Sequence, residues 1–193
     1  MIVTKVFYLK NMLSNSCIKL IEIFCNNNDG VKLDRVILGE VKMTFDETIM
    51  SVDKITSCFK EIGFEIIIDP NVEIVEKTKI AAIELIYMSY NANSLIRNSD
   101  YISDKLQLPY DKISRVFSHV TGVKLEKYII RLKLEKAKEM LCRNEYTVSE
   151  IAFLMDYSSV QYFSNQFKKN VGVTISKFKE TPDKYRKSIE NLI

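Results

Sequence analysis

Two short segments of the sequence carry polar and basic side chains whose types and spacing suit contacts with nucleic acid. An Arg fork matches the acceptor pair of guanine, Asn and Gln amides match the edge of adenine, and a Lys ammonium suits phosphate oxygens. These polar positions alternate with apolar residues at helical spacing, so each segment is predicted to be a helix with one solvent-exposed polar face. The candidate DNA-contacting residues are Asp111, Lys112, Ser114, Arg115, Ser159, Val160, Gln161, Ser164, Asn165, Lys168 and Lys169.

Among these candidates, Arg115 is the one favoured for base reading, over the alternative of a solvated surface arginine. Gln161 and Asn165 suit adenine edges, but a role as ordinary surface amides is weighed equally. A flexible ammonium carries little geometric information, so phosphate contact is expected of the lysines. These are Lys112, Lys168 and Lys169.

Catalytic and metal chemistry find little support in the sequence. His119 is the only histidine, and no nucleophile-base pair or phosphate loop accompanies it, so an enzyme is not expected. The four cysteines are spread over the chain without CxxC spacing, which argues against a disulfide framework or a zinc site. No cofactor is expected.

The charge of the chain is unevenly distributed. The net charge is +3, but residues 97–193 hold 18 Lys and Arg against 12 Asp and Glu, and residues 1–96 hold 10 against 13. The second part is therefore the one suited to a polyanion. The first residues lack a signal peptide pattern and no apolar run approaches bilayer length, so a cytoplasmic protein without a membrane partner is expected.

A weak internal repeat indicates which elements position the candidate side chains. Each copy has a short amphipathic helix, a turn at 107–110 or 156–159, and a second helix at about 109–118 or 159–169, which is the helix-turn-helix plan. Tyr157 and the apolar residues of the second helices are assigned to the core, namely Ile113, Val116, Phe117, Tyr162, Phe163 and Phe167. Three residues of the first copy match residues 49 positions later: Ile102 with Ile151, Leu106 with Met155 and Leu108 with Tyr157. Three more match residues 50 positions later: Ile113 with Phe163, Phe117 with Phe167 and Gly122 with Gly172.

A single helix is predicted between the two copies, over residues 125–142. Eighteen residues make a rod of roughly 27 Å, which suits two recognition helices about one DNA turn, ~34 Å, apart. One chain is then expected to insert both second helices into successive major grooves. Basic residues occur along the rod at Lys127, Arg131, Lys133, Lys136, Lys138 and Arg143.

Residues 95–185 resemble the DNA-binding domain of AraC/XylS-type transcriptional regulators. The resemblance implies a double helix-turn-helix fold, sequence-specific DNA binding and contact with RNA polymerase. Three positions depart from the family pattern: Asp156 replaces a turn glycine, Asn165 an arginine and Ile175 a proline. The matching segments are 113–117, Thr121-Gly122, 128–141, Ile151-Ala152, Tyr157, Tyr162-Phe163-Ser164, Phe167-Lys168-Lys169, Gly172 and Phe178.

The beginning of the chain alternates strand and helix signals in the order βαββαβ. Strands are expected at 2–9, 31–38, 41–45 and 64–68. Two helices are expected from apolar residues at helical spacing. The first has Cys17, Leu20, Ile21 and Phe24, and the second has Ile55, Cys58, Phe59 and Ile62. This order predicts an α+β, ferredoxin-like domain. An all-α double helix-turn-helix domain is expected to follow it.

Residues 1–68 also resemble a heavy-metal-associated domain, through Asn11-Met12, residues 61–65 and the order of elements. The family carries a metal-binding CxxC just after the Met, but here Ser14 replaces the first cysteine and only Cys17 is kept. Because one thiolate is a poor site for a soft cation, no metal is expected. The alternative function is a metal sensor or metallochaperone that uses this domain, with DNA binding secondary.

The predicted domain boundaries are 1–70 for the ferredoxin-like domain, 71–96 for a connecting helix and 97–193 for the DNA-binding domain. Apolar residues of the connecting helix include Ile80, Ile83, Tyr87 and Tyr90, which suit a core or interdomain seam or, alternatively, a dimer interface. Expected partners are double-stranded DNA and RNA polymerase, with an unidentified effector at the first domain and a homodimer as open alternatives. The operator and the direction of regulation do not follow from the sequence.

Overall fold

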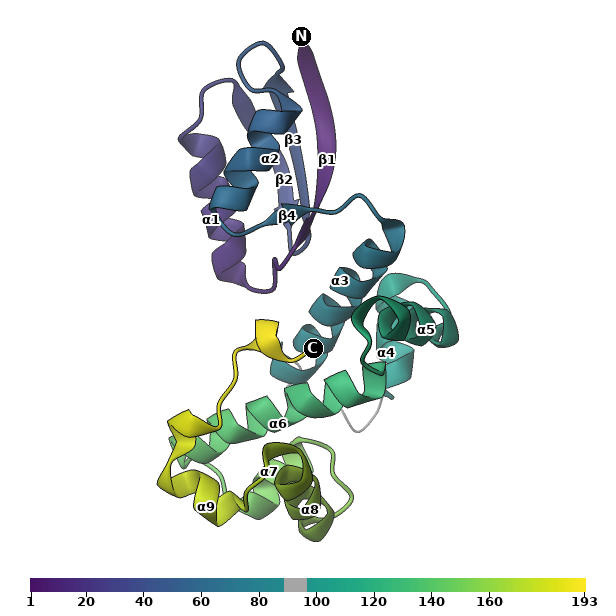
Figure 1. The fold of residues 1–193 in the computed structure, drawn as a ribbon, viewed down its shortest axis with the longest axis vertical. Coiled ribbons are helices and arrows are strands. Elements are labelled where there is room, and N and C mark those ends of the chain that lie inside the picture. Colours follow the sequence, from purple (N-terminus) through teal and green to yellow (C-terminus); the bar gives the residue numbers. More distant parts are fainter. Residues whose placement is uncertain (89–96) are drawn as a thin grey trace. The chain divides into compact units, whose positions relative to one another are not determined.

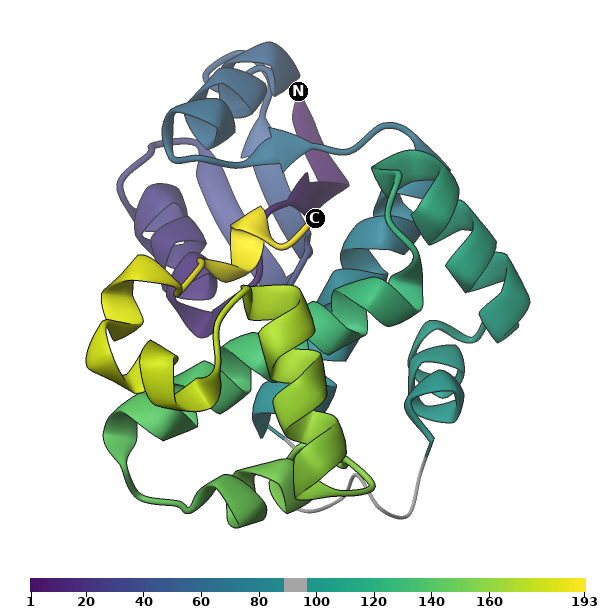
Figure 2. The same cartoon turned by 60° about the horizontal axis from the view of Figure 1, so that its bottom comes forward.

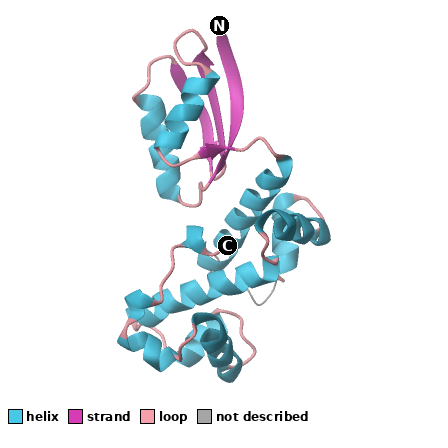
Figure 3. Cartoon of the chain, viewed as in Figure 1, coloured by secondary structure: helices cyan, strands magenta, loops and turns pink. Residues whose placement is uncertain are grey.

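The computed structural model describes residues 1–88 and 97–193, which divide into two compact units, Met1–Ile80 and Ala81–Ile193. In the described residues, all strands belong to the first unit, whereas the second contains helices and loops (Figure 3).

The first unit follows the predicted order of strands and helices. Its elements are β1 (Ile2–Lys10), α1 (Asn15–Asn26), β2 (Val31–Ile37), β3 (Glu40–Asp46), α2 (Val52–Glu61) and β4 (Glu65–Ile66). The four strands form an antiparallel sheet in the order β2-β3-β1-β4. Helices α1 and α2 lie on the same face of this sheet (Figure 1).

Alternation along β3 explains how the sheet and helices share a core. Val41, Met43 and Phe45 are buried, as their spacing of two predicts for one face of a strand. Phe59 of α2 packs against Phe7 of β1, with ring centroids 6.0 Å apart. The two helices and one sheet face therefore enclose a single apolar core.

Two expectations for this unit are corrected. Leu20, assigned to the apolar stripe of α1, is 37% exposed, because the buried side of the helix is centred on Ile21 and Phe24. The last strand was expected at 64–68, but β4 pairs only Ile66 and Glu65 with β1. Ile68 is 92% exposed, since the chain has left the sheet before Pro70.

Helix α3 (Pro70–Ile83) continues into a π-helical turn, η1 (Glu84–Met88). Ile80 and Ile83 are buried and Tyr87 is half-buried. The rest of the predicted connecting helix, including Tyr90, lies outside the described residues.

The second unit is built around one long helix. Its helices are α4 (Asn98–Leu106), α5 (Tyr110–Thr121), α6 (Leu125–Arg143), α7 (Val148–Leu154), α8 (Val160–Val171) and α9 (Ile175–Glu180), followed by short 3-10 turns η3 (Pro182–Lys184) and η4 (Ile189–Asn191). The α4–α5 pair lies at the beginning of α6, and α7, α8 and α9 gather beside its later part (Figure 2).

The turns inside the two helix pairs use the left-handed region of the backbone. Gln107 has φ 54° and Asp156 has φ 57°. Asp is among the residues that tolerate this conformation, which explains how Asp156 occupies a position where the resemblance implies a glycine.

Helix α7, which precedes the turn at Asp156, begins with a capping box. The Thr147 hydroxyl accepts a hydrogen bond from the Glu150 backbone N–H, and the Glu150 carboxylate accepts one from the Thr147 N–H.

Candidate nucleic-acid interface

Helix α5 has one buried face and one polar face. Ile113 and Phe117 are fully buried, and the Phe117 ring packs against Tyr128 of α6 at 5.2 Å. Val116, expected in the core, is half-buried. Asp111, Lys112 and Arg115 are exposed, and Ser114 is half-buried at the edge of the polar face.

Helix α8 repeats this arrangement in the second helix pair. Phe163 and Phe167 are fully buried, with ring centroids 6.0 Å apart. Ser164 is half-buried, and Val160 is 38% exposed. The exposed polar residues are Ser159, Gln161, Asn165, Lys168 and Lys169.

Ser159 is exposed and also caps the beginning of α8. Its hydroxyl accepts a hydrogen bond from the Tyr162 backbone N–H at 3.1 Å, which caps the beginning of α8. Such caps stabilise a helix by about 1 kcal/mol. The position of Ser159 at the helix start is therefore set by helix formation as well as by any contact with DNA.

The exposed cations of both helices are not engaged by neighbouring carboxylates. Among the residues that the structure describes, Lys112, Arg115, Lys168 and Lys169 form no ion pair. Their charges remain available to an external anion.

Tyr162, assigned to the core by its sequence position, is 50% exposed. Because it immediately precedes the buried Phe163, it lies about 100° around the helix from the buried side. Its hydroxyl accepts a hydrogen bond from the Gln166 side-chain amide at 3.3 Å. The ring therefore extends the polar face of α8.

Tyr157 is half-buried and packs against Tyr162 and Phe163, two aromatic residues in the first turn of α8. Its ring centroid lies 5.1 Å from that of Phe163 and 6.0 Å from that of Tyr162. Burial raises the pKa of the Tyr157 hydroxyl to about 12. The hydroxyl is thus a neutral group at every physiological pH.

The basic residues along α6 are not all available to a polyanion, which the charge count did not reveal. Lys133 is buried and its ammonium lies 3.6 Å from the carboxylate of Asp156. Burial lowers the pKa of Lys133, and Asp156 partly offsets this effect. Lys136 and Arg143 both pair with Glu139, at 3.2 and 2.7 Å.

Lys138 of α6 is likewise buried and internally paired. Its ammonium donates to the Glu135 carboxylate at 2.5 Å and to the Tyr185 backbone carbonyl at 2.6 Å. The sequence signal for such pairs is the spacing of three or four residues between Lys and Glu, which places them on one side of a helix. The cations of this unit that remain unpaired among the described residues are therefore fewer than its count of Lys and Arg indicates.

The loop between β1 and α1 brings Ser14 and Cys17 together. The Ser14 hydroxyl lies 3.4 Å from the Cys17 thiol, and the thiol also faces the Asn11 carbonyl at 4.0 Å. No group of three or more His, Cys, Asp or Glu residues that suits a metal ion occurs among the described residues. His119 is exposed near the end of α5.

No helix in the part of the chain that the structure describes combines the length and apolarity needed to cross a bilayer.

Residues 102–187 match the family model described as a helix-turn-helix domain. Within this part, the chain is 38% identical over 78 residues to the transcriptional regulatory protein YesN of Bacillus subtilis (strain 168), covering 39% of this chain and 21% of that protein. It is 31% identical over 68 residues to the transcriptional activator RhaS of Yersinia pestis (strain Pestoides F), covering 35% of this chain and 25% of that protein.

A solved structure is also similar to this part of the chain. The C-terminal domain of AraT, a response regulator from Geobacillus stearothermophilus, is 25% identical, with a TM-score of 0.46, covering 58% of this chain and 86% of that one.

These comparisons confirm the expected helix-turn-helix domain. Residues 102–187 match a helix-turn-helix domain, and this part of the chain is similar to parts of transcriptional regulators. The chain spans only 21 to 25% of the length of the two regulators named above.

Proposed function

We propose that this protein regulates transcription by inserting α5 and α8 into two successive major grooves of one operator. The observation that carries the proposal is the shared design of the two helices. Each buries two aromatic or branched residues and exposes cations that form no ion pair with the residues the structure describes. The protein acts by binding in the cytoplasm and not by catalysis.

Helix α6 supports simultaneous binding by both helices. It comprises 19 residues, or about 28 Å of helix, and it links the two helix pairs directly. Successive major grooves on one side of DNA are about 34 Å apart, and the offset of each pair from the end of α6 adds to the rod length. A monomer is then sufficient to read two half-sites.

The side chains divide into base-reading and phosphate-contacting groups. Arg115 is assigned to a guanine edge and Gln161 and Asn165 to adenine edges, because their planar groups form paired hydrogen bonds. Phosphate contacts are assigned to the flexible ammonium groups. These belong to Lys112, Lys168 and Lys169.

The first unit is inferred to be a ferredoxin-like domain related to heavy-metal-associated domains. The support is the antiparallel strand order β2-β3-β1-β4 with both helices on one sheet face. Ser14 in place of a ligand cysteine leaves one thiolate, so this domain receives a signal other than a soft metal.

Two protein partners complete the proposal. RNA polymerase is the target through which operator binding changes transcription.

The second partner is another copy of the chain. The outer edge of β1 supports the formation of such a dimer. In the described sheet, β4 pairs with Leu9 and Lys10 of β1, and the Ile67 N–H donates to the Tyr8 carbonyl. For residues 2–7 of β1, the described pairing is with β3 alone. Such an edge accepts another strand.

The direct test is selection of a preferred site from random duplexes by the full chain, followed by footprinting. We expect protection of two major grooves on one face of the duplex. Inserting five base pairs between the half-sites turns the second groove to the opposite face, and binding by the monomer should be lost. Failure to enrich any sequence, or unchanged affinity for the shifted site, contradicts the proposal.

A further inference from the structure

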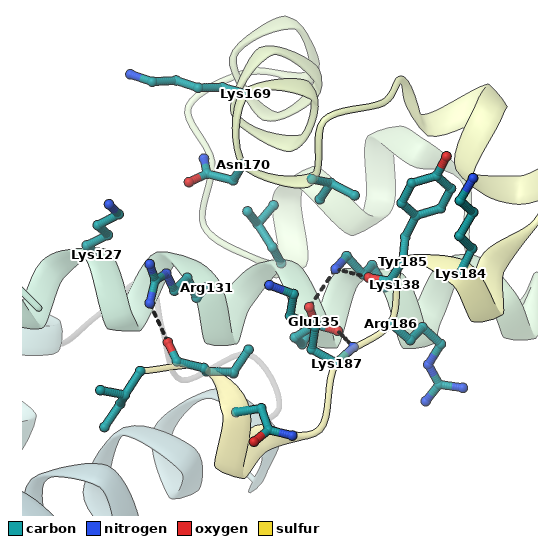
Figure 4. A pocket seen from close by; sticks show the side chains of 15 residues that line it. Lys127, Arg131, Glu135, Lys138, Lys169, Asn170, Lys184, Tyr185, Arg186 and Lys187 are labelled. Atoms are coloured by element: carbon teal, nitrogen blue, oxygen red, sulfur yellow. Dashed lines mark hydrogen bonds and ion pairs between the residues drawn. The ribbon is translucent and has the colours of Figure 1, made fainter.

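A second group of cations, separate from the base-facing residues, surrounds a cavity of about 480 Å³ in the second unit (Figure 4). The cavity is bounded by α6, the last turn of α8 and the segment after η3. Glu135 is the only acidic side chain among its described lining residues, which also include Ile193. The lining cations are Lys127, Arg131, Lys138, Lys169, Lys184, Arg186 and Lys187.

Glu135 is already fully used by the protein and does not neutralise the cavity. One carboxylate oxygen accepts from the Lys138 ammonium at 2.5 Å, and the other accepts from the Lys187 backbone N–H at 3.1 Å. Glu135 and Lys138 are 8% and 3% exposed. This buried pair fixes the segment of residues 185–187 against α6, so basic residues of both segments line the same cavity.

The remaining cations have no intramolecular carboxylate among the described residues. Arg131 donates through Nη1 to the Leu192 carbonyl at 2.6 Å, which orients its guanidinium, and this contact is with a neutral group. Lys127 and Lys187 are exposed at the cavity. Like charges gathered around a partly enclosed space repel one another, and an anion bound there offsets that repulsion.

Size and donor chemistry indicate the class of anion. Small-molecule sites typically occupy about 300–1,000 Å³, and this cavity falls in that range. Ammonium groups and a guanidinium from α6 and from the segment after η3 match an ion that carries several oxygens on more than one phosphate. The side chains of Lys169 and Arg186 point away from the middle of this group (Figure 4). A single chloride or carboxylate leaves most of these donors unused.

We propose that this cavity binds a small molecule that carries two or three linked phosphate groups. The site is distinct from the base-facing surface, since its α8 residues lie in the last turn of that helix, whereas Gln161 and Asn165 lie in the first two turns. Lys169 belongs to the cavity lining and is also assigned to DNA phosphate. The test therefore leaves Lys169 unchanged.

The experiment is isothermal titration of the full chain with inorganic tripolyphosphate at two salt concentrations. We expect saturable one-to-one binding that weakens with salt, and at least tenfold weaker binding by a Lys127→Gln, Lys187→Gln double variant. The matched control is Lys124→Gln, which removes an exposed cation three residues before Lys127 and outside the cavity. Absence of saturable binding, or an equal loss in the control, overturns the proposal.

Two further measurements identify what occupies the site. Citrate, a polycarboxylate of similar charge, should bind at least tenfold more weakly than tripolyphosphate, and equal affinities overturn the assignment to phosphate. DNA affinity of the double variant should fall no more than that of the control. A selective loss of DNA affinity shows that the cations hold the DNA backbone and overturns the small-molecule site. If the first variant misfolds, Lys184→Gln with Arg186→Gln replaces it.

Discussion

The buried carboxylate of Glu76 accepts a hydrogen bond from the Asn11 backbone N–H at 3.1 Å, which ties α3 to the turn between β1 and α1. The other carboxylate oxygen pairs with the Lys79 ammonium at 2.6 Å. Asn11 is itself held at φ 66°, in the left-handed region. The turn that resembles a metal loop is therefore connected to the helix that leads out of the first unit.

Removing this carboxylate should destabilise the first unit. Glu76→Ala leaves the Asn11 N–H and the largely buried Lys79 ammonium without their acceptor, and we expect a loss of about 1–3 kcal/mol in the free energy of unfolding. Glu73→Ala is the control, because Glu73 forms only the helical i,i+4 pair with Lys77, worth about 0.2–0.5 kcal/mol. Urea unfolding followed by circular dichroism measures both, and equal losses contradict the role of Glu76.

Arg115 and Lys168 should differ in the kind of DNA contact that they make. Arg115→Ala should cost about 1–3 kcal/mol at the selected operator and relax base preference there, with a much smaller loss on scrambled duplex. Lys168→Ala should weaken both duplexes alike and reduce the salt slope by about one counterion. Affinities across a salt series measure both effects. An equal loss on both duplexes for Arg115→Ala rejects base reading.

The adjacent aromatic residues Phe163 and Tyr162 should respond very differently to truncation. Phe163 is fully buried, so Phe163→Ala should cost about 3–5 kcal/mol. Tyr162 is half exposed and its hydroxyl meets only Gln166, so Tyr162→Ala should cost well under half as much. Thermal or urea unfolding compares them, and similar destabilisation by both changes shows that Tyr162 belongs to the core.

Restoring the second cysteine should create a site for a soft metal. The native chain is expected to release Cu(I) to a competing chelator, since it offers one thiolate in the loop. Ser14→Cys places a second sulfur close to Cys17, because the hydroxyl that it replaces lies 3.4 Å from that thiol. Chelator competition measures retention. The control is Ser16→Cys, a neighbouring position with no such contact, and retention of Cu(I) by the native chain contradicts the expectation.

If a second copy pairs along β1, the dimer should be sensitive to proline at the outer edge of that strand. Leu9 donates its N–H toward β3, to the Gly39 carbonyl, so alternation directs the Val6 N–H to the outer edge. Val6→Pro therefore removes a donor for a partner strand but none for β3. Sedimentation equilibrium should show a shift to monomer. Val36→Thr on β2 is the control, and a dimer that persists in Val6→Pro excludes pairing through β1.

The sequence by itself determined the order of the strands and helices in the first unit and the most deeply buried residues of α5 and α8, although Tyr162 was wrongly assigned to the core. Periods of two and 3.6 are local properties of the backbone, so the spacing of Val41, Met43 and Phe45 and of Ile113 and Phe117 was sufficient to place them inside. The turn at Asp156 was also predictable, because tolerance of positive φ belongs to the residue itself.

The tertiary structure alone decided which polar groups are free. Charge counting included Lys133 and Lys138 among the basic residues along the helix, but contacts with Asp156, Glu135 and the Tyr185 carbonyl engage both lysines within the protein. Lys127 and Lys187 are 60 positions apart and line one cavity only because residues 185–187 return to α6. Burial and proximity of charges depend on packing between distant segments, and composition and periodicity carry no information about those distances.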